Sequence, residues 1–292
     1  MGLHRDVDNR TQYLGYTRMN IEPRSFSSPG QSSTVVSELI KAHLAAEARK
    51  QTLRRAVKGA RFCAVALDDG ITGVANISPD ACGKPSPEAL RTLPEPGSPA
   101  GDALFLLGSP GGSAAGLATA NALANRSIRD GGLWDETRIG GNLLEVLDLR
   151  PEDHVGMVGH FFPLEEPIRS RVERLSIFER GPRLATGLLS EDHAPEVLSR
   201  CSIAIITATT LINGTCDALL EAATPCRETV LLGPSTPLLP EVFLSAAGRV
   251  TLLSGMVVTD PEALLSVIAR GGGTRDFKGC MAKVNVRVRP GR

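Results

Sequence analysis

The chain lacks the features that would place it in a membrane or on nucleic acid. It has no apolar run of about 18 residues, the minimum for a membrane-crossing helix. The N-terminal stretch MGLHRDVDNRTQYLGYTRMN has no apolar core of the kind a signal peptide needs. Its 32 basic and 32 acidic residues cancel, whereas a protein that coats nucleic acid needs clustered positive charge. We therefore expect a cytoplasmic protein that binds neither membrane nor nucleic acid.

Strong local motifs for metals and nucleophiles are also missing. The six cysteines form no CxxC pair, and the five histidines form no HxxxH pair. There is no GxSxG elbow and no P-loop, so hydrolase and kinase functions lack support. Without a secretion signal the thiols are expected to be reduced, and Cys216 and Cys226 are most simply explained as core residues.

Composition divides the chain into an arm and two halves. Residues 1–30 are polar and predict an N-terminal arm, whose Tyr13 and Tyr16 hint at contact with a second copy of the chain. Residues 31–140 predict a smaller α+β domain. Its expected elements are a helix over about 35–57, a hairpin of RFCAVAL and ITGVANI around an Asp-Gly turn, a proline-rich loop over 79–101 and a helix over 113–126.

Residues 141–292 show a different pattern, in which short apolar runs alternate with helical segments. VGMVG, LSIFE, IAIIT, TVLLG and VTLLSG are predicted strands, separated by segments such as DPEALLSVIAR. This alternation predicts right-handed crossovers and a doubly wound, mostly parallel sheet with helices on both faces. The basic tail KVNVRVRPGR favours an edge strand guarded by arginines, with nucleic-acid binding as the alternative.

Polar and glycine-rich segments follow the predicted parallel strands, where open sheets bind their ligands. Gly156, Gly159, His160 and Phe161 lie at the end of the first strand, and glycines there let a backbone approach a ligand closely. Glu179, 20 residues after Gly159, ends the second strand, where nucleotide-binding sheets place a carboxylate for ribose hydroxyls. The alternative is a solvated glutamate. His160 has no carboxylate paired with it in the sequence, which is typical of a simple hydrogen-bonding residue.

A hydroxyl-rich segment follows the strand IAII. Thr207, Thr209, Thr210, Asn213 and Thr215 are more side chains than one helix cap needs, which favours a binding loop over a cap. Two other loops and one helix add candidates. The loop Gly233–Thr236 is either a second part of this site or a rigid turn. The loop 271–276 with Arg275 is either a flexible link or a contact for an anion. Asn121, within the helix over 113–126, is either a core amide or a ligand contact.

The motifs of the second half resemble those of a known family. VGMVGHFFPL, LSIFER, IAIITATTLINGT, VLLGPSTPLLP and SGMVVTDPEALLSVIARGGGTRDFK are similar, in order, to the “putative heavy-metal chelation” domain family. The resemblance implies a Rossmann-like second domain and a preceding domain similar to the enolase N-terminal fold, with a site between them. It also implies a role in making or handling metal chelators. Cysteine does not recur in the matching motifs.

Our main hypothesis is a small-molecule-binding enzyme with a nucleotide-like cofactor of the S-adenosylmethionine type, acting on a metal-chelating metabolite. The alternatives are a non-catalytic protein that binds a heavy metal or metal complex, with His160, Glu179 and a cysteine as ligands, and a metabolite-sensing scaffold. Catalytic residues are not assigned. The expected cofactor contacts are Gly156, Gly159, His160, Phe161, Glu179, Thr207 and Thr209, and the expected substrate contacts are Asn121, Thr210, Asn213, Gly233, Pro234, Ser235 and Thr236.

Overall fold

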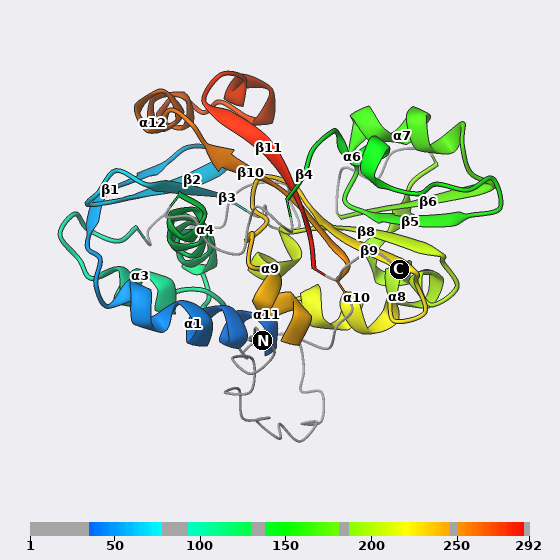
Figure 1. Cartoon of the computed structure of the whole chain (residues 1–292), viewed down its shortest axis with the longest axis horizontal. Helices are drawn as coiled ribbons and strands as arrows, with labels where there is room; N and C mark the ends of the chain where they lie inside the picture. The colour runs from blue at the N-terminus through cyan, green and yellow to red at the C-terminus, as the bar shows by residue number, and fades with distance from the viewer. Residues whose placement is uncertain (1–34, 78–92, 130–137, 181–186, 246–249, 289–292) are drawn as a thin grey trace, which may run out of the picture. The chain divides into compact units, whose positions relative to one another are not determined.

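The computed structural model describes residues 35–77, 93–129, 138–180, 187–245 and 250–288 (Figure 1). The predicted arm, and much of the predicted proline-rich loop, lie outside these residues. The described part contains two sheets, one with three antiparallel strands and one with eight strands that are mostly parallel. This confirms the predicted mixed α/β class with a small α+β part before a doubly wound sheet.

The small sheet has the order β1-β2-β3, with β1 at Leu53–Lys58, β2 at Phe62–Leu67 and β3 at Thr72–Asn76. The predicted hairpin is confirmed, and its Gly70 has the positive φ of 84° that the turn requires. The predicted helix over 35–57 is wrong at its end, because α1 covers Val35–Ala48 and β1 follows. The segment LRRAVK pairs with β2 instead, so tertiary pairing overrides its tolerance for a helix.

Helices α3 (Ala100–Phe105) and α4 (Ser113–Arg129) accompany this sheet, and α4 packs on β2 and β3. The predicted helix over 113–126 is therefore confirmed and continues for one more turn. α4 approaches β3 so closely that a Cβ on Gly73 would lie 2.2 Å from the carbonyl oxygen of Ala118 and from the backbone nitrogen of Ala122. Small residues in α4 make this contact possible.

The large sheet has the order β4-β11-β10-β9-β8-β5-β6-β7. Strands β5 to β10 run parallel, and β11 and β4 are joined to them by antiparallel pairs. The strand bounds are Arg138–Ile139 for β4, His154–Val158 for β5, Arg174–Glu179 for β6, Leu189–Ser190 for β7, Ile203–Thr207 for β8, Glu228–Leu232 for β9, Leu252–Val258 for β10 and Met281–Arg287 for β11.

Apolar side chains on both faces of the large sheet are buried. Met157, Ile205 and Val230 belong to a core shared with helix residues such as Ile168. Val158, Ile206 and Leu231 face a second core that continues into α1 and α4. The helices of this half are α6 (Leu143–Val146), α7 (Phe162–Arg169), α8 (Ala194–Leu198), α9 (Thr210–Asn213), α10 (Cys216–Ala222), α11 (Pro240–Ser245) and α12 (Pro261–Ala269), with 3-10 turns at Glu191–His193 and Thr274–Phe277.

The last two strands connect the halves of the chain. Beyond its pairing with β9, β10 continues to Val258 beside β11, and α12 then packs on β1 and β2. The Phe277 ring meets the Phe62 ring of β2 edge-on, with 4.8 Å between centroids. Figure 1 shows this C-terminal segment, in orange and red, beside the blue strands of the small sheet.

The basic tail forms β11, but β11 is not the outermost strand. The two-residue strand β4 pairs with Asn285 and Val286, and Arg287 binds Glu228 at 2.7 Å rather than guarding an edge. The edge-strand prediction is therefore wrong, because a two-residue strand leaves no periodic pattern in the sequence.

The N-terminus of α1 is held by a carboxylate from the second half. The Asp217 side chain of α10 accepts hydrogen bonds from the backbone N–H groups of Val35 (2.7 Å) and Val36 (3.2 Å). Such groups have no partner inside the helix, and a carboxylate also suits the positive end of the helix dipole.

We expect Asp217→Ala to lower the free energy of unfolding by about 1 kcal/mol, as the loss of a helix cap does. Urea unfolding would measure the change. Glu221→Ala, an exposed substitution on the same helix, should change it by less than about 0.5 kcal/mol. An equal effect of the two substitutions would show that the contact with α1 contributes nothing.

Candidate ligand site at the carboxyl edge of the parallel sheet

The order of the parallel strands reverses at β5. β5 lies between β6 and β8, and the chain passes from β5 to β6 and β7 before it returns to β8. Open α/β sheets bind ligands beyond the carboxyl ends of the two strands that flank such a switch point. The segments in question here follow Val158 in β5 and Thr207 in β8.

Glycines let the loops at this edge come together. Gly159 has φ +88°, and a Cβ there would lie 3.0 Å from Cβ of Thr207. Gly233, after β9, has φ +116°. A Cβ on Gly233 would lie 3.8 Å from one edge of the Phe161 ring, and a Cβ on Gly159 would lie 3.7 Å from its opposite edge. Gly159, Phe161, Thr207 and Gly233 thus lie close together. Other residues would be strained at both glycines.

Gly156 lies inside β5 rather than at its end. A Cβ there would lie 2.5 Å from Leu198 and 3.1 Å from Sγ of Cys201. The residue is needed so that the end of α8 can pack on the sheet, which explains a glycine without any ligand.

Glu179 and His160 are linked across the ends of β5 and β6. The backbone N–H of His160 donates to Oε2 of Glu179 at 3.2 Å, and the N–H of Arg180 donates to Oε1 at 2.9 Å. Each carboxylate oxygen keeps a second lone pair, so the group is oriented and still able to accept hydrogen bonds. Glu179 is partly exposed, as a ligand contact requires.

His160 has an acidic partner that sequence reasoning missed. Its Nε2 lies 2.7 Å from Oε2 of Glu165 in α7, and Arg169 binds the other oxygen at 3.0 Å. The hydrogen bond from His160, followed by that from Arg169, lowers the pKa of Glu165. Because an ionised Glu165 can only accept, Nε2 of His160 carries the proton, and Nδ1 of a neutral ring is left as a base. The sequence signal was an acidic residue in the first turn of the helix after the glycine-histidine loop.

The hydroxyl-rich segment after β8 is only partly available to a ligand. The Thr210 hydroxyl is buried and donates to the carbonyl of Thr207 at 2.7 Å, and Asn213 Oδ1 accepts from Thr215 at 2.8 Å. The hydroxyls of Thr207 and Thr209 lie 3.0 Å apart and are partly exposed. The turn itself thus uses Thr210 and Asn213, while Thr207 and Thr209 line the edge.

Asn121 and the Ser235 loop join the two sheets. Nδ2 of Asn121 donates to the carbonyls of Val74 (2.8 Å) and Ser235 (3.2 Å), and the Ser235 hydroxyl accepts from the N–H of Asn76 at 2.8 Å. Thr236, which donates to Ser254, and Ser235 are each only 2% exposed. We call these contacts the seam. It positions the two halves, while Pro234 at its start is partly exposed.

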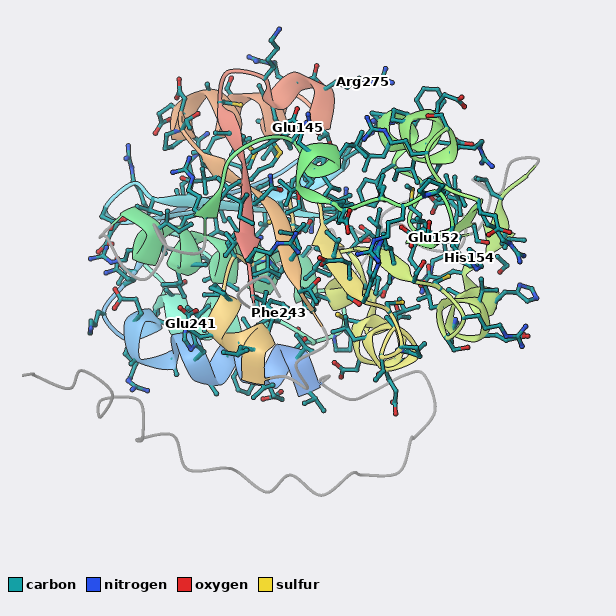
Figure 2. The ribbon with its side chains drawn as sticks, turned by 45° about the vertical axis from the view of Figure 1, so that its right-hand side comes forward. Glu145, Glu152, His154, Glu241, Phe243 and Arg275 are labelled. Atoms are coloured by element: carbon teal, nitrogen blue, oxygen red, sulfur yellow. The ribbon has the colours of Figure 1, made fainter. Side chains whose placement is uncertain are left out.

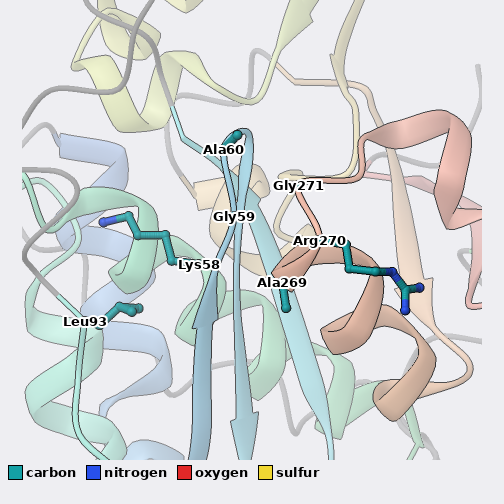
Figure 3. Close-up of a pocket in the computed structure, with 7 residues that line it drawn as sticks. All are labelled: Lys58, Gly59, Ala60, Leu93, Ala269, Arg270 and Gly271. Atoms are coloured by element: carbon teal, nitrogen blue, oxygen red, sulfur yellow. The ribbon is translucent and has the colours of Figure 1, made fainter.

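A hollow of about 600 Å³ lies elsewhere, between the β1–β2 turn and the end of α12 (Figure 3). Lys58 and Arg270 line it together with Gly271, and it includes none of the predicted contact residues. Burial lowers the pKa of Lys58. The neighbouring Arg275 is exposed and points outward from its 3-10 turn, where Asp276 caps the N–H of Gly273 (Figure 2). Within the loop 271–276, Gly271 thus borders this hollow and Arg275 faces solvent.

Two family models, both described as “putative heavy-metal chelation”, match residues 142–287 and 41–124. The first of them, DUF364, covers half of the chain. The chain belongs to the DUF364 family. Solved DUF364 structures described as proteins with unknown function, from Pyrococcus horikoshii and Desulfitobacterium hafniense, share its fold with TM-scores of 0.74 and 0.71. They are 21% and 22% identical, covering 87% and 86% of this chain and 100% and 97% of their own.

A curated relative is also similar. The “uncharacterized protein MJ0500” of Methanocaldococcus jannaschii is 27% identical over 136 residues, which are 46% of this chain and 52% of that protein. The chain thus spans about half the length of the curated relative it matches. Among the described helices, none combines the length and the apolar character that crossing a bilayer demands.

The metal that the DUF364 description implies does not fit the carboxyl edge. Within the described residues, no group of three or more His, Cys, Asp or Glu side chains could hold a metal ion. His160 and Glu179 touch through a backbone N–H, and the described cysteines other than Cys226 are buried. The ligand set of His160, Glu179 and a cysteine is therefore not assembled here.

Proposed function

We propose that this DUF364 protein is a small-molecule-binding enzyme whose ligand occupies the carboxyl edge of the parallel sheet, next to the seam. The meeting of the Gly159 and Thr207 loops at the switch point carries this proposal. The loops of Gly159 and Gly233, which both have positive φ, expose backbone atoms to a ligand at this edge, where parallel sheets bind nucleotide-like ligands.

The proposed cofactor is nucleotide-like, of the S-adenosylmethionine type. Glu179 supports it, because its carboxylate is oriented by two backbone N–H groups and retains lone pairs for ribose hydroxyls. When bound, S-adenosylmethionine supplies an electrophilic carbon for group transfer. The chain's part is to bind and orient both reactants, which can account for much of the rate of such a reaction.

His160 would act as the base for the substrate. The ionised Glu165 fixes the tautomer and stabilises the imidazolium after proton uptake, in the manner of the carboxylates that orient histidines in other active sites. Thr207 and Thr209 would contact polar groups of the ligand. The roles proposed for Thr210, Asn213, Asn121, Ser235 and Thr236 change from direct contact to support of the site, because these side chains form hydrogen bonds within the protein. Within the described residues, Oδ1 of Asn121 is buried without a hydrogen-bond partner.

The family description, together with the absence of a three-donor metal site among the residues that the structure describes, favours a substrate that itself chelates metal. A protein that makes or handles a metal-binding metabolite does not need a site of three or more side chains that coordinates the metal directly. The proposed substrate is therefore a small polar molecule with several oxygen or nitrogen donors.

Calorimetry with S-adenosylmethionine, S-adenosylhomocysteine, NAD and ATP tests the proposal. We expect binding of an S-adenosyl compound, weakened about 10- to 100-fold by Glu179→Gln, because hydrogen bonds to a charged group contribute about 1.5–3 kcal/mol. Glu173→Gln, an exposed neighbour before β6, should bind like the unchanged chain. No binding of any of the four compounds would overturn the nucleotide assignment, and equal binding by the two variants would remove Glu179 from it.

A further inference from the structure

Two cysteines occupy equivalent positions at the amino edge of the sheet, opposite the candidate site. Cys201 precedes Ile203 by two residues and Cys226 precedes Glu228 by two, and Ile203 pairs with Glu228 in the parallel ladder of β8 and β9. The N–H of Arg227 bonds the carbonyl of Ser202 at 2.9 Å, which extends the pairing to the residues between. Neighbouring strands are about 4.8 Å apart, so the two cysteine backbones lie side by side.

Their sulfur atoms also approach the same place. Sγ of Cys201 lies 3.3 Å from the carbonyl oxygen of Val197, and Sγ of Cys226 lies 3.6 Å from that of Leu198. These are consecutive carbonyls at the end of α8. Cys201 is 4% exposed and Cys226 is partly exposed, so the pair is sheltered and still reachable from solvent.

We infer that Cys201 and Cys226 form a two-thiolate site for one soft metal ion with linear coordination, such as Cu⁺. Thiolates are the ligands that soft ions prefer. Metal–thiolate bonds are about 2.3 Å long, so a linear site places its two sulfur atoms about 4.6 Å apart. The described residues bring no third side chain to make a tetrahedral site, which selects two-coordinate ions over zinc.

Binding requires both thiols to lose a proton. Burial raises the pKa of Cys201 to about 11, although the positive charge of Arg174 opposes the rise. Burial raises the pKa of Cys226 to about 12, and the negative charge on Cys201 adds to the rise. Both are thiols at neutral pH, so one Cu⁺ displaces two protons and leaves a bis-thiolate. The apparent affinity should then rise about 100-fold for each pH unit. Burial, followed by the positive charge of Arg174, lowers the pKa of His154 on the adjoining β5 (Figure 2).

Anaerobic competition of the reduced full chain with a chromophoric Cu⁺ chelator tests the site. We expect one Cu⁺ per chain bound with this pH dependence, and X-ray absorption should show two sulfur neighbours. Cys201→Ser and Cys226→Ser should each weaken binding at least 100-fold. Cys216→Ser should retain it, since that thiol is buried in α10, where Thr210 is its hydrogen-bond partner. Undiminished binding by a variant carrying both Cys201→Ser and Cys226→Ser, or three or more ligands on the copper, would overturn the assignment.

A second measurement needs no substitution and so does not depend on how a variant folds. The unchanged chain is treated with N-ethylmaleimide with and without one equivalent of Cu⁺, and each cysteine peptide is quantified by mass spectrometry. Cu⁺ should slow the alkylation of Cys201 and Cys226 together. Protection of neither, or of only one, would contradict a shared ion. The result is independent of nucleotide binding at the other edge.

Discussion

Gly73→Ala is expected to be among the most destabilising single substitutions in this chain. The added methyl group would lie 2.2 Å from two backbone atoms of α4, and backbone cannot rotate away as a side chain can. Overpacking of this kind costs about 1–3 kcal/mol, and we expect the upper end of that range. α4 would have to move off β3, and Asn121, whose backbone carbon would be 2.7 Å from the new methyl, would move with it. Urea unfolding should show the loss.

Gly101→Ala provides the matched control. It makes the same chemical change in α3, where a Cβ meets nothing within 4 Å. Alanine is favoured over glycine in a helix by about 0.5–1 kcal/mol, so this variant should be slightly more stable than the unchanged chain. If Gly73→Ala unfolded at the same urea concentration as the unchanged chain, the close approach of α4 to β3 would be wrong.

Loss of the Arg227 side chain is expected to destabilise the chain by about 1.5–3 kcal/mol, because the buried Asp153 then loses a charged hydrogen bond, although Arg227 itself is 28% exposed. Nη2 of Arg227 binds Oδ2 of Asp153 at 2.6 Å and the carbonyl of Asp148 at 2.6 Å. Asp153 is only 3% exposed. In Arg227→Met, the Asp153 carboxylate would still accept a hydrogen bond from the backbone N–H of Arg150, at 2.7 Å, but would have lost the positive charge of Arg227.

The comparison is with an exposed pair of the same kind. Arg200 binds Glu196 at 3.2 Å, but the two side chains are 73% and 68% exposed. Arg200→Met should therefore change the free energy of unfolding by less than about 1 kcal/mol. Thermal or urea unfolding of both variants would measure the difference. Similar losses in both would show that burial of Asp153 does not govern the effect.

Strong periodic signals predicted most of the fold. The alternation of strands and helices after residue 141 gave the parallel sheet, and the Asp-Gly turn gave the β2–β3 hairpin. β1 could not be recognised because LRRAVK also suits a helix, and its strand form depends on pairing with β2. The two-residue strand β4 is defined by its contact with β11 and by nothing in its own sequence.

For the candidate site, the sequence predicted that certain loops would lie at one edge of the sheet, but not which side chains would be free to contact a ligand. The rule that ligands bind beyond the carboxyl ends of parallel strands placed Gly159, Phe161, Thr207 and Gly233 at one edge, and the structure brings them together. The sequence could not show which polar side chains were already used. Ser235 is occupied by its hydrogen bonds to residues 114 and 159 positions away. Long-range pairing of this kind leaves no local pattern.

The orange and red segment of Figure 1 has a consequence for the order in which the protein can be completed during synthesis. Phe62 and Val74 belong to a core cluster whose other members include Ile268 and Phe277, near the opposite end of the chain. A ribosome that has just released the small sheet leaves that cluster open to solvent until almost the whole polypeptide has been translated. Nascent chains stalled before residue 261 should therefore be bound by chaperones that recognise exposed apolar strands.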